Sequence, residues 1–79
     1  MILADRVRAK FEQAGHRISP RDDVDERAAA WFLGMRPGTL RNWRSRGCGP
    51  QYVKLGAGAF YPIESLLAFV RASVIETEK

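Results

Sequence analysis

The stretch from Ala29 to Gly47, AAWFLGMRPGTLRNWRSRG, constrains the fold more than any other part of the chain. Gly34 and Pro37 lie between two short helical patterns, because glycine is favoured just past the end of a helix and proline in a first helical turn. In the second pattern Leu40 and Trp43 share one face, since residues three apart are neighbours on a helix. The stretch therefore predicts two short helices joined by a tight turn.

The face of the second helix that lies opposite Leu40 is polar and cationic. At about 100° per residue, this face carries Gly38, Arg41, Asn42 and Ser45. Two helices that combine an apolar face with a cationic, hydrogen-bonding face are typical of a helix-turn-helix that reads DNA. The stretch thus predicts a double-stranded DNA-binding element.

The distribution of charge favours the same interpretation. The chain has a formal net charge of +4, and residues 24–47 hold five arginines against only Asp25 and Glu26. No Asp or Glu occurs between Glu26 and Glu64, so the positive field lies over the predicted two-helix unit, where a phosphate backbone would be attracted. A basic face that is simply solvated is the alternative, and the charge pattern alone does not separate the two.

Other classes of protein are not indicated. The sequence has no apolar run long enough to span a bilayer and no recognisable signal peptide, so we expect a cytoplasmic protein without a membrane partner. One cysteine, Cys48, and one histidine, His16, do not supply the ligands of a usual zinc site. We find no paired base and nucleophile and no phosphate-binding loop. We therefore expect no enzyme activity, no metal and no cofactor.

Residues 1–23 are expected to precede the DNA-binding domain. Residues 1–15 predict an amphipathic helix from about Ile2 to Ala14, with Gly15 as its stop and with a stripe formed by Leu3, Val7, Phe11 and Ala14. Residues 16–23, HRISPRDD, have the proline and paired aspartates of a linker. The first helix of the two-helix unit is expected to begin near Asp25, a favourable N-cap residue.

Residues 24–75 are expected to form one domain, mostly α with a small two-stranded β-hairpin, in the order of a winged helix-turn-helix. Two short apolar runs, Tyr52–Leu55 and Ala59–Tyr61, flank the glycines Gly56 and Gly58 and predict the hairpin. Pro62 is expected to open the last helix. The predicted core stripe of that helix is Ile63, Leu66, Leu67, Val70 and Val74.

Five motifs occur in order along residues 24–70: Ala29-Ala30-x-x-Leu33-Gly34, Thr39-Leu40-x-x-Trp43-Arg44, Gly47-x-Gly49-Pro50, Tyr52-Val53-Lys54-Leu55-Gly56 and Tyr61-Pro62-x-x-x-Leu66. Their order and spacing resemble those of phage excisionases and excisionase-like regulators, small DNA-binding proteins with a winged fold of the MerR type. The resemblance implies a recombination directionality factor that loads on repeated sites, bends DNA and assists a tyrosine integrase in excision. A transcriptional regulator of a prophage or mobile element is the alternative, and a protein-interaction module is a more distant one.

The chain also departs from this family pattern. It has Ala28 where such proteins often carry a glutamate, and Arg36 in place of the usual serine cap. Its wing tip, Gly56-Ala57-Gly58-Ala59, lacks the usual arginines, so only its backbone N–H groups could contact phosphate there.

Candidate contact residues follow from the helical wheel. Arg41, Asn42 and Ser45 are predicted to read bases, because arginine can pair bidentately with guanine and asparagine with adenine. Trp43 is expected to pack in the core. For Arg44, which lies close to Leu40 on the wheel, covering apolar neighbours with its stem is an equally weighted alternative. Contacts to the DNA backbone are predicted for Arg36, Thr39, Arg44, Arg46 and Lys54.

Trp31 is predicted to make a contact between parts of the protein. It faces away from the core side of its helix, where a tryptophan would leave a large apolar surface in water. We expect the N-terminal helix, through Leu3, Val7 and Phe11, to cover it, either within the chain or on a neighbouring copy. Because a single module buries only about 600–1,000 Å² on DNA, we also expect head-to-tail self-association on repeated sites.

Overall fold

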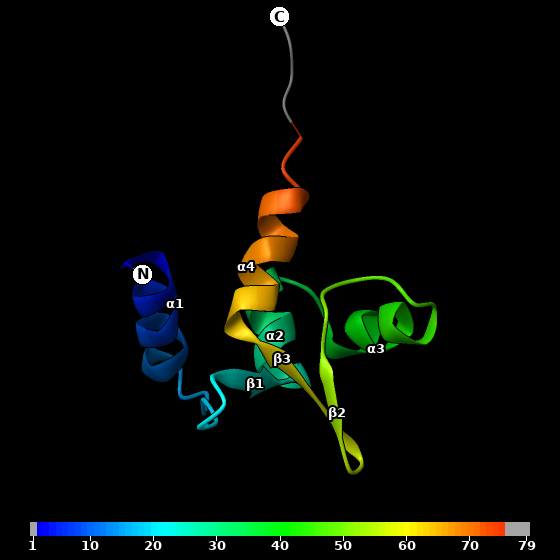
Figure 1. Cartoon of the computed structure of the whole chain (residues 1–79), viewed down its shortest axis with the longest axis horizontal. Helices are drawn as coiled ribbons and strands as arrows, with labels where there is room; N and C mark the ends of the chain where they lie inside the picture. Colours follow the sequence, from blue (N-terminus) through cyan, green and yellow to red (C-terminus); the bar gives the residue numbers. More distant parts are fainter. Residues whose placement is uncertain (1, 76–79) are drawn as a thin grey trace, which may run out of the picture.

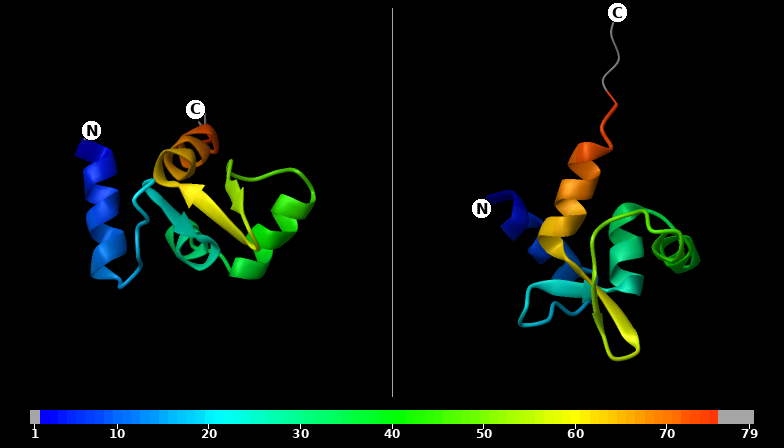
Figure 2. Two further views of the ribbon diagram at one scale, coloured as in Figure 1. Left: turned by 60° about the horizontal axis from the view of Figure 1, so that its bottom comes forward. Right: turned by 45° about the vertical axis from the view of Figure 1, so that its right-hand side comes forward.

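The computed structural model describes residues 2–75, in which four helices pack around a three-stranded antiparallel sheet (Figure 1). The helices α1 and α3 lie on opposite sides of a centre made of the sheet, α2 and α4 (Figure 2). The elements in chain order are α1 (Ile2–Gln13), β1 (Asp23–Asp25), α2 (Glu26–Leu33), α3 (Pro37–Ser45), β2 (Val53–Leu55), β3 (Gly58–Pro62) and α4 (Ile63–Ala72).

The ends of the helices are set by local chemistry, as the sequence predicted. The side chain of Asp25 caps α2 by accepting a hydrogen bond from the Ala28 N–H at 2.9 Å. Gly34 ends α2 in the left-handed conformation, with φ 73°, which an L side chain rarely adopts. Pro37 is the first residue of α3, where its missing N–H has no helical partner to lose. These caps confirm the predicted boundaries of the two-helix unit.

The sheet corrects the sequence prediction, because it has three strands and not two. Its central strand is β3, which pairs with β2 through Val53 and Phe60 and with β1 through Val24 and Tyr61. Residues 23–25 were expected as the end of a linker and a helix cap. Their pairing with a strand far along the chain outweighs the turn preference of two aspartates. The fold is therefore mixed α and β, with four helices and a three-stranded antiparallel sheet.

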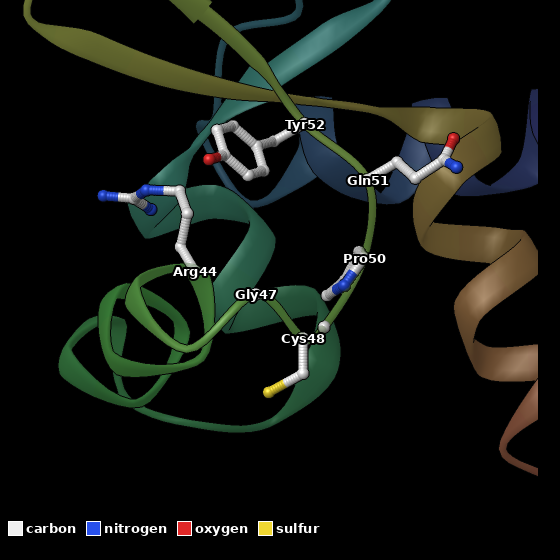
Figure 3. A pocket seen from close by; sticks show the side chains of 7 residues that line it. Arg44, Gly47, Cys48, Pro50, Gln51 and Tyr52 are labelled. Carbon is white, nitrogen blue, oxygen red and sulfur yellow. The ribbon is translucent and has the colours of Figure 1, made fainter.

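The loop from Gly47 to Tyr52 closes over the end of α3 (Figure 3). Together with Arg44 it lines a cavity of about 380 Å³, and Cys48 is exposed in it. Gly49 has φ 92°, and a Cβ atom placed there would lie 3.0 Å from Cε3 of Trp43. The loop can approach the Trp43 ring this closely only because residue 49 has no side chain.

Most of the buried apolar residues in the described part of the chain form one core that includes residues of α1. Phe11 of α1 is fully buried in it, and Val7 joins the same cluster. Val70 and Val74, which were predicted as core, are exposed. Val70 lies in the second half of α4, whose C-terminal end extends past the other elements (Figure 1), and Val74 follows the last residue of the helix, Ala72. The buried members of the core are Val7, Phe11, Val24, Ala28, Ala29, Ala30, Leu40, Ala59, Tyr61, Ile63 and Leu66.

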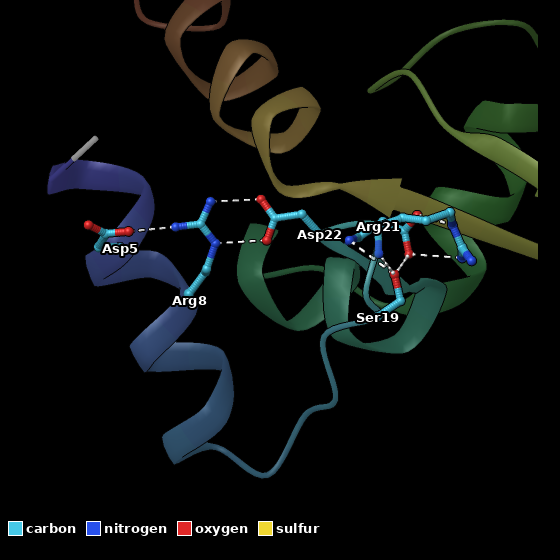
Figure 4. A network of polar contacts seen from close by, with 6 residues as sticks. Asp5, Arg8, Ser19, Arg21 and Asp22 are labelled. Atoms are coloured by element: carbon cyan, nitrogen blue, oxygen red, sulfur yellow. Dashed lines mark hydrogen bonds and ion pairs between the residues drawn. The ribbon is translucent and has the colours of Figure 1, made fainter.

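Residues 16–23 form a hydrogen-bonded turn that ties α1 to the sheet (Figure 4). The Ser19 hydroxyl and the Arg21 guanidinium both donate to the buried carboxylate of Asp23, at 2.5 and 3.0 Å. Arg8 of α1 donates two hydrogen bonds to Asp22, each of 2.7 Å. These bonds hold the pKa of the Asp22 carboxyl below its ordinary value. The segment expected to be a linker is thus part of the folded unit.

Candidate nucleic-acid interface

Helix α3 presents its apolar face to the core and its polar face to solvent. Leu40 is buried, and the Trp43 ring packs against Phe69 of α4 with ring centroids 5.6 Å apart. Trp43 is therefore a packing residue, as predicted. The three predicted base readers, Arg41, Asn42 and Ser45, all lie on the exposed side of the helix.

The residues predicted to contact the DNA backbone lie in four different environments. Arg36 and Arg46 are exposed and occupy the two cap positions of α3, one at each end of the helix. Lys54 is exposed on the edge strand β2, and Thr39 is half-buried. The fifth residue, Arg44, is mostly covered.

Arg44 is mostly covered and is paired within the chain, so its environment favours the alternative in which its side chain packs on neighbours over a phosphate contact. Its side chain is only 18 % exposed, and its Nη1 donates to the hydroxyl of Tyr61 at 3.0 Å and to Oε1 of Glu26 at 3.2 Å. The guanidinium carbon also lies 5.5 Å from the centre of the Tyr52 ring. The bond to Tyr61 and the charge of Glu26 raise the pKa of Arg44, so it carries a fixed positive charge. Arg44 thus joins α3 to α2 and to β3.

Glu26 is the site residue that sequence analysis missed. Its side chain is 18 % exposed, and its two oxygens face two arginines of α3: Oε1 meets Arg44, and Oε2 lies 3.2 Å from Nη2 of Arg41. The only sequence signal was that Glu26 is the last acid before the long acid-free span. Because the carboxylate and the arginines belong to different helices, no periodicity in either helix reveals the contact.

A groove of about 620 Å³ lies between α3 and the β2–β3 hairpin. Its helical walls carry Arg27, Arg41 and Arg44, and residues 57–60 of the hairpin form the opposite side. The hairpin projects from the body of the protein beside α3 (Figure 2). The groove therefore has charged side chains of both signs, including Asp25 and Glu26, on one wall and the uncharged residues 57–60 on the other.

The contact between α1 and Trp31 occurs within the chain. The Trp31 ring centroid lies 5.4 Å from that of Phe11 and 5.0 Å from that of His16, although 44 % of the tryptophan remains exposed. Val7 and Phe11 are buried in the core of the same chain, which corresponds to the within-chain alternative of the prediction. Leu3 is 49 % exposed and is not part of the buried stripe.

Comparison of the chain with protein-family models, curated proteins and solved structures gives no match. Within residues 2–75, no helix is both long enough and apolar enough to cross a membrane. The same residues contain no group of three or more His, Cys, Asp or Glu side chains placed to hold a metal ion.

Proposed function

We propose that this chain is a sequence-specific double-stranded DNA-binding protein with the organisation of a winged helix-turn-helix. In this proposal α2 and α3 form the helix-turn-helix, α3 enters the major groove, and the β2–β3 hairpin is the wing. The observation that carries the proposal is the exposed face of α3, where Arg41, Asn42 and Ser45 lie side by side without an acidic neighbour on the same helix. A helix with this face supplies donors and acceptors that match base edges.

The other basic residues have distinct roles in this proposal. Arg36 and Arg46, at the two ends of α3, contact phosphates on either side of the bases that the helix reads. Lys54 on β2 and the backbone N–H groups of the hairpin tip contact phosphates of the DNA that flanks the bases read by α3. Arg44 binds no DNA and fixes the position of α3 on the rest of the fold.

Within this class we favour a recombination directionality factor, which assists a tyrosine integrase in excising an integrated element. The support is the family resemblance of residues 24–70 and the small size of the reading surface, which requires several copies on repeated sites. Cooperative, same-direction loading on tandem sites with bending of the duplex would support this role. Independent loading without bending would favour a transcriptional regulator.

Replacing Arg46 by glutamine tests the proposed DNA contact. Loss of one phosphate contact should weaken binding to all duplexes and lower the log–log salt slope by roughly one unit. The measurement is a fluorescence-anisotropy titration at several salt concentrations, on a random duplex and on a duplex selected from a randomised library.

The matched control is Arg71→Gln, which removes the same charge from an exposed site on α4. If Arg46→Gln and Arg71→Gln had equal effects, the basic surface would act only through net charge, and the α3 face would not be the binding site. If the wild-type protein bound no duplex but bound an acidic protein, it would be an interaction module.

A further inference from the structure

The carboxylate of Glu26 holds the two arginines of α3 in unequal ways. Arg44 is fixed by two hydrogen bonds and is mostly covered, whereas the Arg41 side chain is 67 % exposed and meets Glu26 only through Nη2. The buried Oε2 that faces Arg41 has no hydrogen-bond partner of good geometry among the described residues. Arg41 is therefore oriented by charge attraction and not locked by a hydrogen bond.

The geometry leaves most donors of Arg41 free. A guanidinium has five N–H donors, and a bidentate contact to O6 and N7 of guanine needs only two of them. A carboxylate that attracts one amino group of the guanidinium can bias its orientation while the other edge remains available. Holding a long side chain in its bound orientation lowers the conformational entropy that binding must remove.

Glu26 can stay ionised and keep its position in α2 while Arg41 contacts a base. It lies in the first turn of α2, where the helix dipole favours a negative charge. Its other oxygen stays with Arg44, which Tyr61 anchors from the sheet. The same negative charge lines the groove between α3 and the hairpin, where it competes with phosphate groups for Arg41.

We propose that Glu26 is a specificity-determining positioning residue, which aims Arg41 at a guanine edge and keeps it from binding phosphates of unrelated sequences. This inference rests on the proposed DNA-binding function. Glu26 touches no base itself and acts through Arg41. Its removal therefore lowers the discrimination between sequences from both sides, because binding to the selected duplex weakens while binding to random duplexes strengthens.

The experiment compares Glu26→Gln with Glu64→Gln, which removes an exposed carboxylate of α4. Both variants are titrated with the selected duplex and with a random duplex over a range of salt concentrations. For Glu26→Gln, the ratio of the two affinities should fall about fivefold or more, as for loss of one bidentate base contact. The salt slope on the random duplex should rise by roughly one unit, because the released Arg41 gains a phosphate. Glu64→Gln should change neither the ratio nor the slope.

A double-mutant cycle with Arg41→Ala separates positioning from a general structural effect. If Glu26 acts through Arg41, Glu26→Gln should not lower the discrimination further once Arg41 is absent. An equal loss in both backgrounds would overturn the inference. So would an affinity ratio for Glu26→Gln that matches the ratio for Glu64→Gln.

Should Glu26→Gln not fold, the Arg41 Nε–H resonance of the wild-type protein provides the same test. It should shift on adding the selected duplex and stay in place on adding a random one. Equal shifts on both would overturn the inference. Binding of no duplex by the wild-type protein would instead contradict the proposed function, which distinguishes the two failures.

Discussion

Replacing Phe11 by alanine tests whether α1 is part of the folded domain. The ring is fully buried and lies 5.4 and 5.5 Å from the rings of Trp31 and Phe32, centroid to centroid. An aromatic side chain buries about 150–250 Å². At about 25 cal/mol per Å², the lower end of this range corresponds to a loss of roughly 4 kcal/mol in the free energy of unfolding. This agrees with the 3–5 kcal/mol, approximately, that Phe→Ala substitutions cost in protein cores. A domain of this length has a free energy of unfolding of about 4–12 kcal/mol, so the variant should lose a third of it or more.

Thermal unfolding followed by circular dichroism and tryptophan fluorescence measures the effect. At about 4–8 °C per kcal/mol for a domain of this size, the unfolding midpoint should fall by at least about 15 °C. The matched control is Leu3→Ala on the same helix, where the side chain is half exposed and the loss should stay below about 1 kcal/mol. If Phe11→Ala had the same unfolding midpoint as Leu3→Ala and left the tryptophan emission spectrum unchanged, α1 would not pack on the domain and the reasoning would be refuted.

Two further predictions concern turns. Because Arg8 lowers the folded-state pKa of Asp22, the stability from this contact is present above the ordinary value of 3.8 and is lost as the pH falls through the lower folded value. Residue 22 has a left-handed backbone conformation that asparagine tolerates. Asp22→Asn should therefore be less stable than the wild type at neutral pH and equally stable in acid. A difference in urea midpoint between the two proteins that did not change with pH would contradict this. Gly49→Ala should destabilise the protein by more than about 1 kcal/mol through strain and the clash with Trp43. The control Gly38→Ala, in a helix with open space around it, should be neutral or stabilising in the same urea titration.

The sequence predicted those features that depend on neighbouring residues. The Asp25 cap, the left-handed Gly34 and the first-turn Pro37 fix the bounds of α2 and α3 because each acts within one helical turn. The packing role of Trp43 followed from its spacing to Leu40. Such local rules suffice where the partner of a group lies three or four residues away.

Features that depend on distant pairing were not predictable in this way. The strand β1 exists because Val24 pairs with Tyr61, and no property of the sequence near Val24 indicates that partner. The role of Arg44 depends on Glu26, which is 18 residues away on another helix. Val70 matches the apolar periodicity of α4 but is exposed, because periodicity does not indicate how far along the helix the other elements cover it. The predicted DNA contacts of Arg41 and Asn42 remain predictions.

The direct passage from β3 into α4 has a mechanical consequence. Pro62 is the last residue of the strand and Ile63 the first of the helix, and the Ile63 N–H donates to the Asp22 carbonyl oxygen at 3.0 Å. Proline restricts its own φ angle, and β3 is paired on both edges, so this junction provides no hinge. We therefore expect the hairpin and the helical body to move together as one unit. If the proposed DNA-binding function holds, differences in groove width would have to be accommodated by bending or twisting of the duplex, and the elastic stiffness of each DNA sequence would contribute to specificity.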